Sequence, residues 1–278
     1  MSRWTLVLTG TGTSHGNPLW GHREWWSEDP RDHRRRSGAM LLADDGRVVL
    51  IDLGPDLAYQ LRDPFRRWDG VCYPEDCIMR CDGVLLTHDH ADHCHGLNEL
   101  RQLNRLMRGA EIVIHGHASH LQAVRGMFPY AFVIGPEAYH LGKPSLLTRA
   151  QIDGQPFAVA GLPLVMVPLD HGPAGRVSGF RCGPFAYLTD MKLLPAASDQ
   201  YLQNLDLLVM NVLRDEPHAT HQCWAEAMAV LARLRPRRTV LTHVGPEVRF
   251  AAWADRLSPT LELAVDGWHA SLELPDAR

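Results

Sequence analysis

The stretch Thr87-His88-Asp89-His90-Ala91-Asp92-His93 decides the fold of this chain. The apolar residues 83–86 before it predict a buried strand, and residues 95–107 after it predict a helix. The motif therefore falls on the loop that follows a strand, where loops present reactive side chains on a rigid sheet. Imidazole and carboxylate are ligands that divalent zinc, manganese and iron prefer. The H-x-H-x-D-H spacing after an apolar strand thus predicts a metal site.

One loop cannot supply all the ligands of a two-metal site, so the motif predicts partners farther along the chain. Each partner should be a His or Asp at the end of an apolar run. Three runs end in this way: 164–169 leads into Asp170-His171, 185–188 into Thr189-Asp190, and 239–241 into Thr242-His243. All three partners therefore occur in the same strand-then-ligand context as the first motif.

This order of ligands resembles the metallo-β-lactamase superfamily. The resemblance covers nearly the whole chain and implies an α/β fold, an αββα four-layer sandwich of two mixed sheets, as a single domain over residues 1–278. Carried over residue by residue, it implies that one metal ion is held by His88, His90 and His171. The other ion would be held by Asp92, His93 and His243, with Asp190 bridging the two.

The flanking motifs narrow the resemblance to one branch of the superfamily. They include Asp52-Leu53-Gly54-Pro55-Asp56-Leu57, Asp170-His171-Gly172 and His218-Ala219-Thr220-His221. Together they are similar to the branch that contains the cyclic phosphodiesterase of bacterial phosphonate breakdown. That branch implies a metal-dependent phosphoric diester hydrolase, in which a hydroxide activated by two divalent ions, Mn or Zn, attacks phosphorus.

The leaving alkoxide needs a proton, and the resemblance implies that His221 supplies it, with Asp92 as a further catalytic residue. His218 is the competing candidate for the acid. We expect His221 to open a helix, whose N-terminus lowers the pKa of an imidazole. A nearby carboxylate is therefore expected to offset that effect.

The remaining periodic segments predict the rest of the sandwich. Strands are expected at 4–9, 39–42, 47–51, 111–115, 178–182 and 207–212, and helices at 55–61, 118–128 and after residue 221. The last two strands, 261–265 and 271–274, are expected to close the sheet around Asp266-Gly267.

Composition and charge exclude several classes of protein. The 278 residues, 45% of them hydrophobic, suit one large α/β core. No apolar run approaches the ~20 residues of a membrane helix. The N-terminus lacks the regions of a signal peptide, so we expect a cytoplasmic protein without a membrane partner. A net charge of −4 does not indicate the basic surface that a long nucleic acid needs, so the expected partner is a small phosphodiester. Assembly as a homodimer stays open.

Several segments depart from the branch. Residues 19–36 lack the cysteines with which relatives bind a structural zinc. Their Arg34-Arg35-Arg36 run is expected to be solvated, with a phosphate contact as the alternative. The Gly- and Pro-rich residues 135–161 are expected to form a lid or another insertion that faces the substrate. Asn211 stands where relatives often carry Asp.

Two groups of potential ligands lie outside the pattern of the superfamily. Reduced thiols are expected at Cys72, Cys77 and Cys81, with a structural metal as the alternative. We expect three further histidines to be surface residues or neighbours of the metal ligands: His115, His117 and His120.

Two other classes of function compete with a phosphodiesterase. Lactonases, thioesterases and tRNA 3′-processing nucleases share these ligands, because fold and metal do not fix the reaction. The nuclease normally carries a basic arm, whereas residues 135–161 hold one Lys and one Arg. The second class is a non-catalytic binding protein, as in coenzyme biosynthesis. That relative has a degraded motif, whereas every ligand position is filled here.

Overall fold

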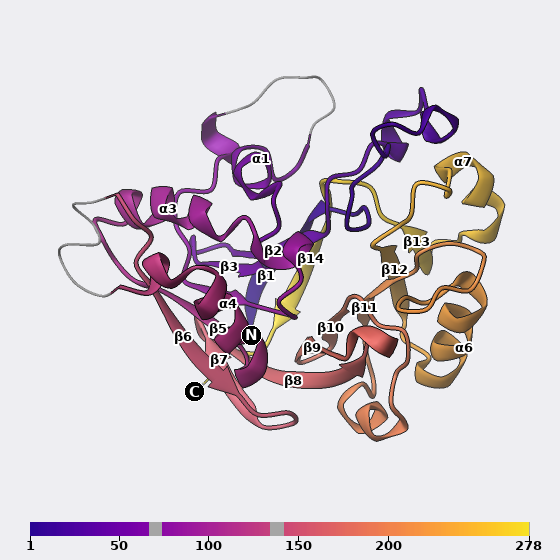
Figure 1. Ribbon diagram of the computed structural model, residues 1–278. Coiled ribbons are helices and arrows are strands. Elements are labelled where there is room, and N and C mark those ends of the chain that lie inside the picture. Colours follow the sequence, from indigo (N-terminus) through magenta and orange to yellow (C-terminus); the bar gives the residue numbers. More distant parts are fainter. Residues whose placement is uncertain (67–73, 134–141, 278) are drawn as a thin grey trace.

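The structure is a computed structural model that describes residues 1–66, 74–133 and 142–277, and it places two seven-stranded sheets face to face (Figure 1). The first sheet has the order β14-β1-β2-β3-β4-β5-β6, and the second β13-β12-β11-β10-β9-β8-β7. Both sheets contain parallel and antiparallel pairs, which confirms the predicted pair of mixed sheets.

The strands of the first sheet are β1 (Ser2–Gly10), β2 (Gly38–Ala43), β3 (Val48–Ile51), β4 (Gly83–Leu85), β5 (Ile112–His117), β6 (Leu146–Gln151) and β14 (Trp268–Leu274). Those of the second sheet are β7 (Pro156–Val159), β8 (Leu162–Asp170), β9 (Arg176–Cys182), β10 (Phe185–Leu188), β11 (Leu207–Asn211), β12 (Arg238–Thr242) and β13 (Leu261–Leu263).

Alternating side chains build three apolar layers. On β3, Val49 and Ile51 join the core between the sheets, whereas Val48 and Leu50 pack on the outer face under helices. On β10, Tyr187 points into the same central core. Because successive side chains of a strand point to opposite faces, each sheet needs a cover on its outer side.

Helices supply that cover on both sides, which confirms the αββα order (Figure 1). The first sheet is covered by α1 (Leu57–Arg62), α2 (Ala91–Cys94), α3 (Leu100–Leu106) and α4 (Ala118–Met127), and the second by α6 (Trp224–Leu234) and α7 (Phe250–Trp253). Short 3₁₀ turns are η1 (Arg23–Trp25), η2 (Pro30–Asp32), η3 (Pro74–Asp76), η4 (Leu97–Glu99), η5 (Pro129–Phe132), η6 (Gly172–Ala174), η7 (Ala196–Tyr201) and η8 (Ala254–Arg256). Within the described ranges, none of these helices has the length and apolar character needed to cross a membrane.

The helix expected at 95–107 is interrupted and begins earlier than predicted. α2 starts inside the metal-binding motif, and η4 separates it from α3. Gly96 lies at the break, where its N–H donates to Leu53 O, and a Cβ at this position would lie 1.9 Å from Gly54 O. This close approach of two backbones needs glycine and ties the motif to the loop after β3.

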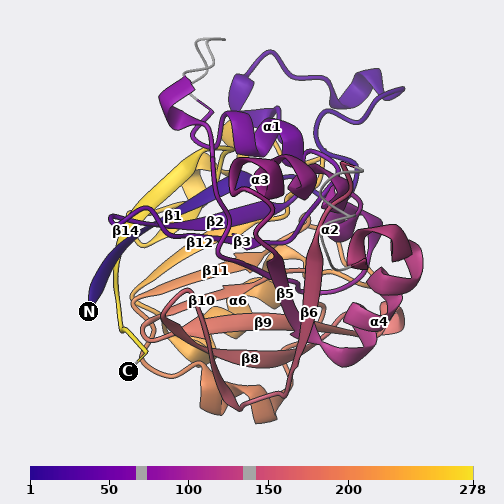
Figure 2. The ribbon, with the colours of Figure 1, turned by 90° about the vertical axis from the view of Figure 1, so that its left-hand side faces the viewer.

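The last two strands lie in different sheets, so the prediction that they close one sheet is wrong. β13 pairs with β12, whereas β14 pairs with β1 in a register that joins Ser2 to Leu274. The chain thus crosses between the sheets around Asp266, and its two ends lie close together (Figure 2). Alternation predicts a strand, but the identity of its partner depends on contacts far apart in sequence.

The insertion expected at 135–161 is not a lid over its described part. Residues 146–151 and 156–159 are β6 and β7, the edge strands of the two sheets, so this segment carries the chain from one sheet to the other. Residues 134–141 lie outside the described residues. β6 escaped prediction because an edge strand is half exposed and its Thr148-Arg149-Ala150 stretch has no apolar alternation.

Candidate metal centre

All seven predicted ligands meet at the ends of four strands. Residues 88–93 follow β4, and the other three ligands follow β8, β10 and β12. They form two groups, in each of which the potential ligand atoms lie within 4.8 Å of one another. One, here called the three-histidine cluster, comprises His88, His90 and His171; the other, here called the mixed cluster, comprises Asp92, His93, Asp190 and His243.

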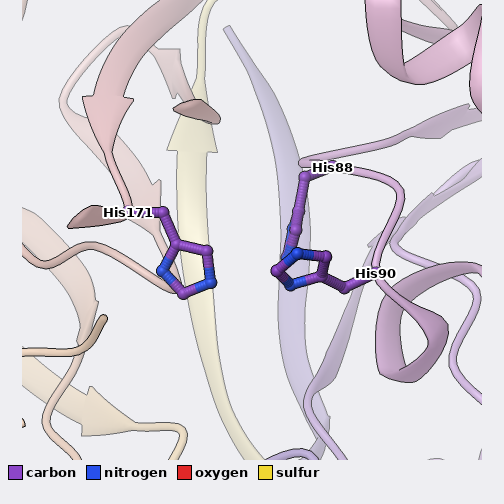
Figure 3. A group of neighbouring side chains, drawn as sticks. All are labelled: His88, His90 and His171. Carbon is purple, nitrogen blue, oxygen red and sulfur yellow. The ribbon is translucent and has the colours of Figure 1, made fainter. Parts of the chain in front are cut away.

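The three-histidine cluster joins the two sheets (Figure 3). His88 and His90 come from the loop after β4, and the ring of His171 faces them from the end of β8. The ring centroids of His171 lie 5.5 Å from His88 and 5.2 Å from His90. His90 is exposed, so the cluster opens to solvent on that side.

Two rings of this cluster, those of His171 and His88, are poised as neutral ligands. Burial lowers the pKa of His171 to about 4 and holds the pKa of His88 well below its usual range. His171 Nδ1 donates to Thr220 O over 2.7 Å, which leaves Nε2 with a free lone pair. Nε2 of His88 is buried and has no hydrogen-bond partner among the described residues.

The mixed cluster instead holds buried charges in contact. His93 Nε2 lies 2.7 Å from Asp190 Oδ2 and 3.1 Å from Asp92 Oδ2, and His243 Nε2 lies 2.9 Å from Asp190 Oδ1. Burial disfavours the charged ring of His243, yet the two carboxylates override it and raise its pKa to about 9. The same attraction holds the pKa of Asp190 well below its usual range, against the effect of burial.

These side chains fit divalent metal ions. The Nε2 atoms of His93 and His243 approach carboxylate oxygens closely, yet within the described structure neither has a partner in hydrogen-bond geometry. Converging imidazole nitrogens and carboxylate oxygens without hydrogen bonds between them are what a shared cation requires. Asp190 also lies within 4.8 Å of His171, so one carboxylate reaches from the mixed cluster toward the three-histidine cluster. This position suits the bridging role expected for it.

Asp52 is a supporting residue that the sequence prediction missed. Its Oδ2 accepts from His93 Nδ1 over 2.7 Å, and its carboxylate also accepts from the N–H and hydroxyl of Thr87. These bonds fix the tautomer and the direction of the His93 ring, which is how carboxylates behind metal-bound histidines act. Asp52 directly follows β3, so the rule that found the ligands, an Asp or His at the end of an apolar strand, also applies to it.

Three site residues have left-handed backbone conformations. The φ angles are 64° at Asp52, 53° at Asp190 and 57° at His243. This region costs roughly 1–2 kcal/mol for a residue with a Cβ. Such conformations cluster at functional sites, where the surrounding structure holds them in place. Asp52 and His243 directly follow a strand and Asp190 follows one residue later, and at each position the turn points the side chain into the centre.

The structure corrects the expected surroundings of His221. α6 begins at Trp224 with Cys223 as its N-cap, so His221 does not open the helix. The pKa of His221 is lowered by burial, which Asp190 opposes. His221 Nε2 donates to Asp190 Oδ1 over 2.7 Å, so the expected carboxylate is present. His218 Nδ1 lies 3.3 Å from the other ring nitrogen of His221.

The remaining sequence candidates have other surroundings. Asn211 accepts from Met191 N and donates to Met191 O, a pair of bonds for which an amide is required, and so supports the residue after Asp190. His120 is buried and its Nδ1 donates to Asp89 inside the motif, so it is a neighbour of the ligands.

Arg34 is only 2% exposed, so the expectation of a solvated run is wrong for this residue.

The expected thiols are partly described. Cys77 Sγ donates to Arg62 O, and Cys81, a free cysteine, donates from Sγ to Gly83 O. Cys72 lies outside the described residues. In the ranges that the structure covers, no cysteine joins a group of three potential metal ligands.

Loading the metal-free protein is expected to release about two protons per chain near neutral pH, because metal ligation needs neutral imidazoles. His93 and His243 have raised pKa values and are charged before the metal binds. Release should fall as the pH rises through about 9, where His243 is already neutral. Titration calorimetry in buffers of different ionisation enthalpy measures the number of protons. His243→Ala should release about one proton fewer; uptake without release would contradict the charges assigned to the mixed cluster.

Comparisons with known proteins agree with this fold. The family described as Beta-lactamase superfamily domain matches residues 47–244. The crystal structure of a new diphosphatase from the PhnP family is 29% identical, with a TM-score of 0.82 over 98% of both chains. Zinc-bound PqqB from Methylobacterium extorquens is 18% identical, with a TM-score of 0.71 over 96% of this chain and 100% of that one.

Among curated proteins, an octanoyltransferase of Porphyromonas gingivalis is 30% identical over 271 residues. The match covers 96% of this chain and 51% of that protein, so the chain spans about half the length of this relative.

Proposed function

The chain belongs to the metallo-β-lactamase superfamily, and from this premise we propose that it hydrolyses small phosphodiesters, above all a cyclic phosphate on a ribose-like or nucleotide scaffold. One observation carries the proposal: a single buried carboxylate, Asp190, contacts His93 within the mixed cluster, lies within reach of His171 and accepts a hydrogen bond from His221. Two cation positions and a proton donor thus surround one space. The similarity to the PhnP-family diphosphatase supports a phosphorus centre as the target.

The proposed ligands are the three-histidine cluster for one ion and the mixed cluster for the other. Two divalent ions bound there would supply a water of lowered pKa as the nucleophile and would neutralise charge on the phosphoryl oxygens. Asp190, which lies near His93, His243 and His171, would help to hold both ions, and Asp52 would hold the ring of His93. His90 lies on the exposed side, where a substrate would enter.

His221 would supply a proton to the leaving alkoxide. Its ring centroid lies 4.9 Å from His171 and 4.9 Å from His243, between the two clusters. The Thr220 hydroxyl lies 2.8 Å from His221 Nδ1 and orients the ring. An unassisted sugar alkoxide is a poor leaving group, so an acid at this position has a task.

A small substrate also suits the charge of the protein. A long nucleic acid needs a Lys or Arg for each phosphate that is neutralised, and the chain has a net charge of −4. A two-metal centre, by contrast, holds one phosphate with few protein cations.

The test is a panel of substrates offered to the protein loaded with Mn²⁺ or Zn²⁺. We expect hydrolysis of bis-aryl phosphate and of ribose or nucleotide cyclic phosphates, and little hydrolysis of monoesters. His90→Ala serves as the control, because activity that survives it would come from a contaminant. If the loaded protein ignores every phosphodiester yet opens lactones or cleaves thioesters, the phosphodiesterase proposal is wrong.

A further inference from the structure

A pocket separate from the metal centre lies where the segment that joins β1 to β2 meets the sheets. This segment, indigo in Figure 1, extends away from the two sheets. The volume of the pocket is about 330 Å³, at the small end of the range for ligand sites. None of its lining residues belongs to the metal clusters. Most of the residues that line it are basic or imidazole-bearing: His15, His33, Arg34, Arg35, Arg36 and Arg66. Asp56 is the one acidic residue among the described residues that line it.

Arg34 is the unusual member of this wall. It is 2% exposed, and its NH1 donates to Thr11 Oγ1 and to Ala264 O. Its Nε and NH2 are buried and have no hydrogen-bond partner in the described part of the chain. Burial lowers its pKa only to about 10, because Asp266 and Asp32 oppose that effect, so the group stays charged near neutral pH. A buried guanidinium with two unused nitrogens is costly unless an acceptor is supplied.

The neighbouring arginines are held in place by carboxylates behind them. Arg36 NH1 lies 3.0 Å from Asp56 Oδ1, and Arg35 NH2 lies 3.4 Å from Asp63 Oδ2. The Arg36 N–H donates to the other oxygen of Asp56 over 2.8 Å, so both oxygens of this acid are occupied. Arg66 pairs with Asp266. Three of these four arginines thus pair with a carboxylate, whereas Arg34 makes no direct ion pair among the described residues.

We propose that this pocket binds a phosphate-class oxyanion, either free phosphate or the phosphate of a small ester. Guanidinium groups bind such oxyanions strongly because several N–H donors match the oxygens and the bonds are charge-assisted. A bound anion would accept from the unused nitrogens of Arg34 and balance its charge. The site does not depend on the hydrolytic reaction, since it shares no residue with the metal centre.

Hydrogen bonds to the backbone connect the wall of the pocket to the segment that carries His243. Asn17, which lines the pocket, donates from Nδ2 to Val244 O over 3.1 Å, and Val244 directly follows His243. Gly12 forms bridges to both Arg36 and Val244. One wall of the pocket is therefore hydrogen-bonded to the segment that carries one of the proposed metal ligands.

Binding of inorganic phosphate to the full chain, treated with a chelator so that no metal can hold it, tests the proposal. Titration calorimetry at low ionic strength should show one site per chain, weakened by added chloride because the attraction is electrostatic. Arg34→Met should weaken binding roughly tenfold or more, since it removes charge-assisted hydrogen bonds. Arg214→Met is the matched control, because Arg214 pairs with Glu247 outside the pocket, and it should bind phosphate as the wild type does.

A second measurement covers the case in which Arg34→Met does not fold. The Nε–H of Arg34 is buried, and its ¹⁵N resonance in the wild-type protein should shift when phosphate is added. Parallel titration with glycerol 3-phosphate separates the two sources: tighter binding of the ester assigns the pocket to a phosphorylated metabolite, and tighter binding of phosphate assigns it to the free anion. If the chelated wild type binds neither, or if Arg34→Met binds both as the wild type does, the proposal is overturned.

Discussion

Replacing Asp190 with Ala is expected to lower metal occupancy at both positions together and to slow phosphodiester hydrolysis roughly 10³-fold. The carboxylate lies 2.7 Å from His93 Nε2 and 2.9 Å from His243 Nε2, and it is within 4.8 Å of His171. Its loss removes negative charge that both cations would share. Loss of about 4 kcal/mol of transition-state stabilisation, a usual size for a metal-dependent step, corresponds to the stated factor.

Elemental analysis of the purified variant, beside the rate with bis-aryl phosphate, measures both effects. Asp199→Ala is a suitable control, because Asp199 pairs with Arg233 away from the metal centre; it should keep about two equivalents of metal and its activity. Asp190→Asn retains one ligand oxygen and should fall between the wild type and Asp190→Ala. Loss of only one ion from Asp190→Ala would show that the carboxylate does not bridge.

The sequence predicts best the strands that are buried on both faces. β3 is predictable because Val48, Val49, Leu50 and Ile51 are all apolar and the Asp-Gly turn before them marks a hairpin. β6 is not, because only one of its ends is buried and Arg149 is exposed. The sequence also does not predict that β13 and β14 lie in different sheets. β14 pairs with β1, whose residues lie more than 200 positions away, as with Ser2 and Leu274.

The metal centre was predictable for a local reason, and its supports were not. The candidate ligands lie on the segments that follow four apolar strands, so they can be identified without knowing the fold. Asp52 has the same context and was available to the same rule. The contact of His120 with Asp89 carries no such signal, because His120 lies on a helix and its partner is 31 residues away. The buried Arg34 side chain bonds to Ala264 O, 230 residues away, so the local sequence of three arginines predicts only a solvated surface.

Replacing His221 with Ala is expected to leave the metal content unchanged and to slow esters with alkoxide leaving groups by roughly 10²–10⁴-fold. An aryl oxide leaves without a proton donor, so bis-aryl phosphate should be affected far less. The structure also allows a competing role, since His171, Asp190 and His221 have ligand atoms within 4.8 Å of one another and are able to hold an ion themselves. The metal content of His221→Ala distinguishes the two roles, because loss of an acid leaves the metal in place and loss of a ligand does not.

His218→Ala is the matched control for the acid, because His218 is the neighbouring imidazole, with its Nδ1 3.3 Å from His221 Nδ1. His221 is the better placed of the two, since its Nε2 already donates to Asp190, at the centre of the site. We therefore expect His218→Ala to keep most of its activity on both kinds of ester. A selective loss on alkoxide esters in His218→Ala would transfer the acid role to His218. An equal loss on both kinds of ester in His221→Ala, together with a missing equivalent of metal, would make His221 a ligand instead.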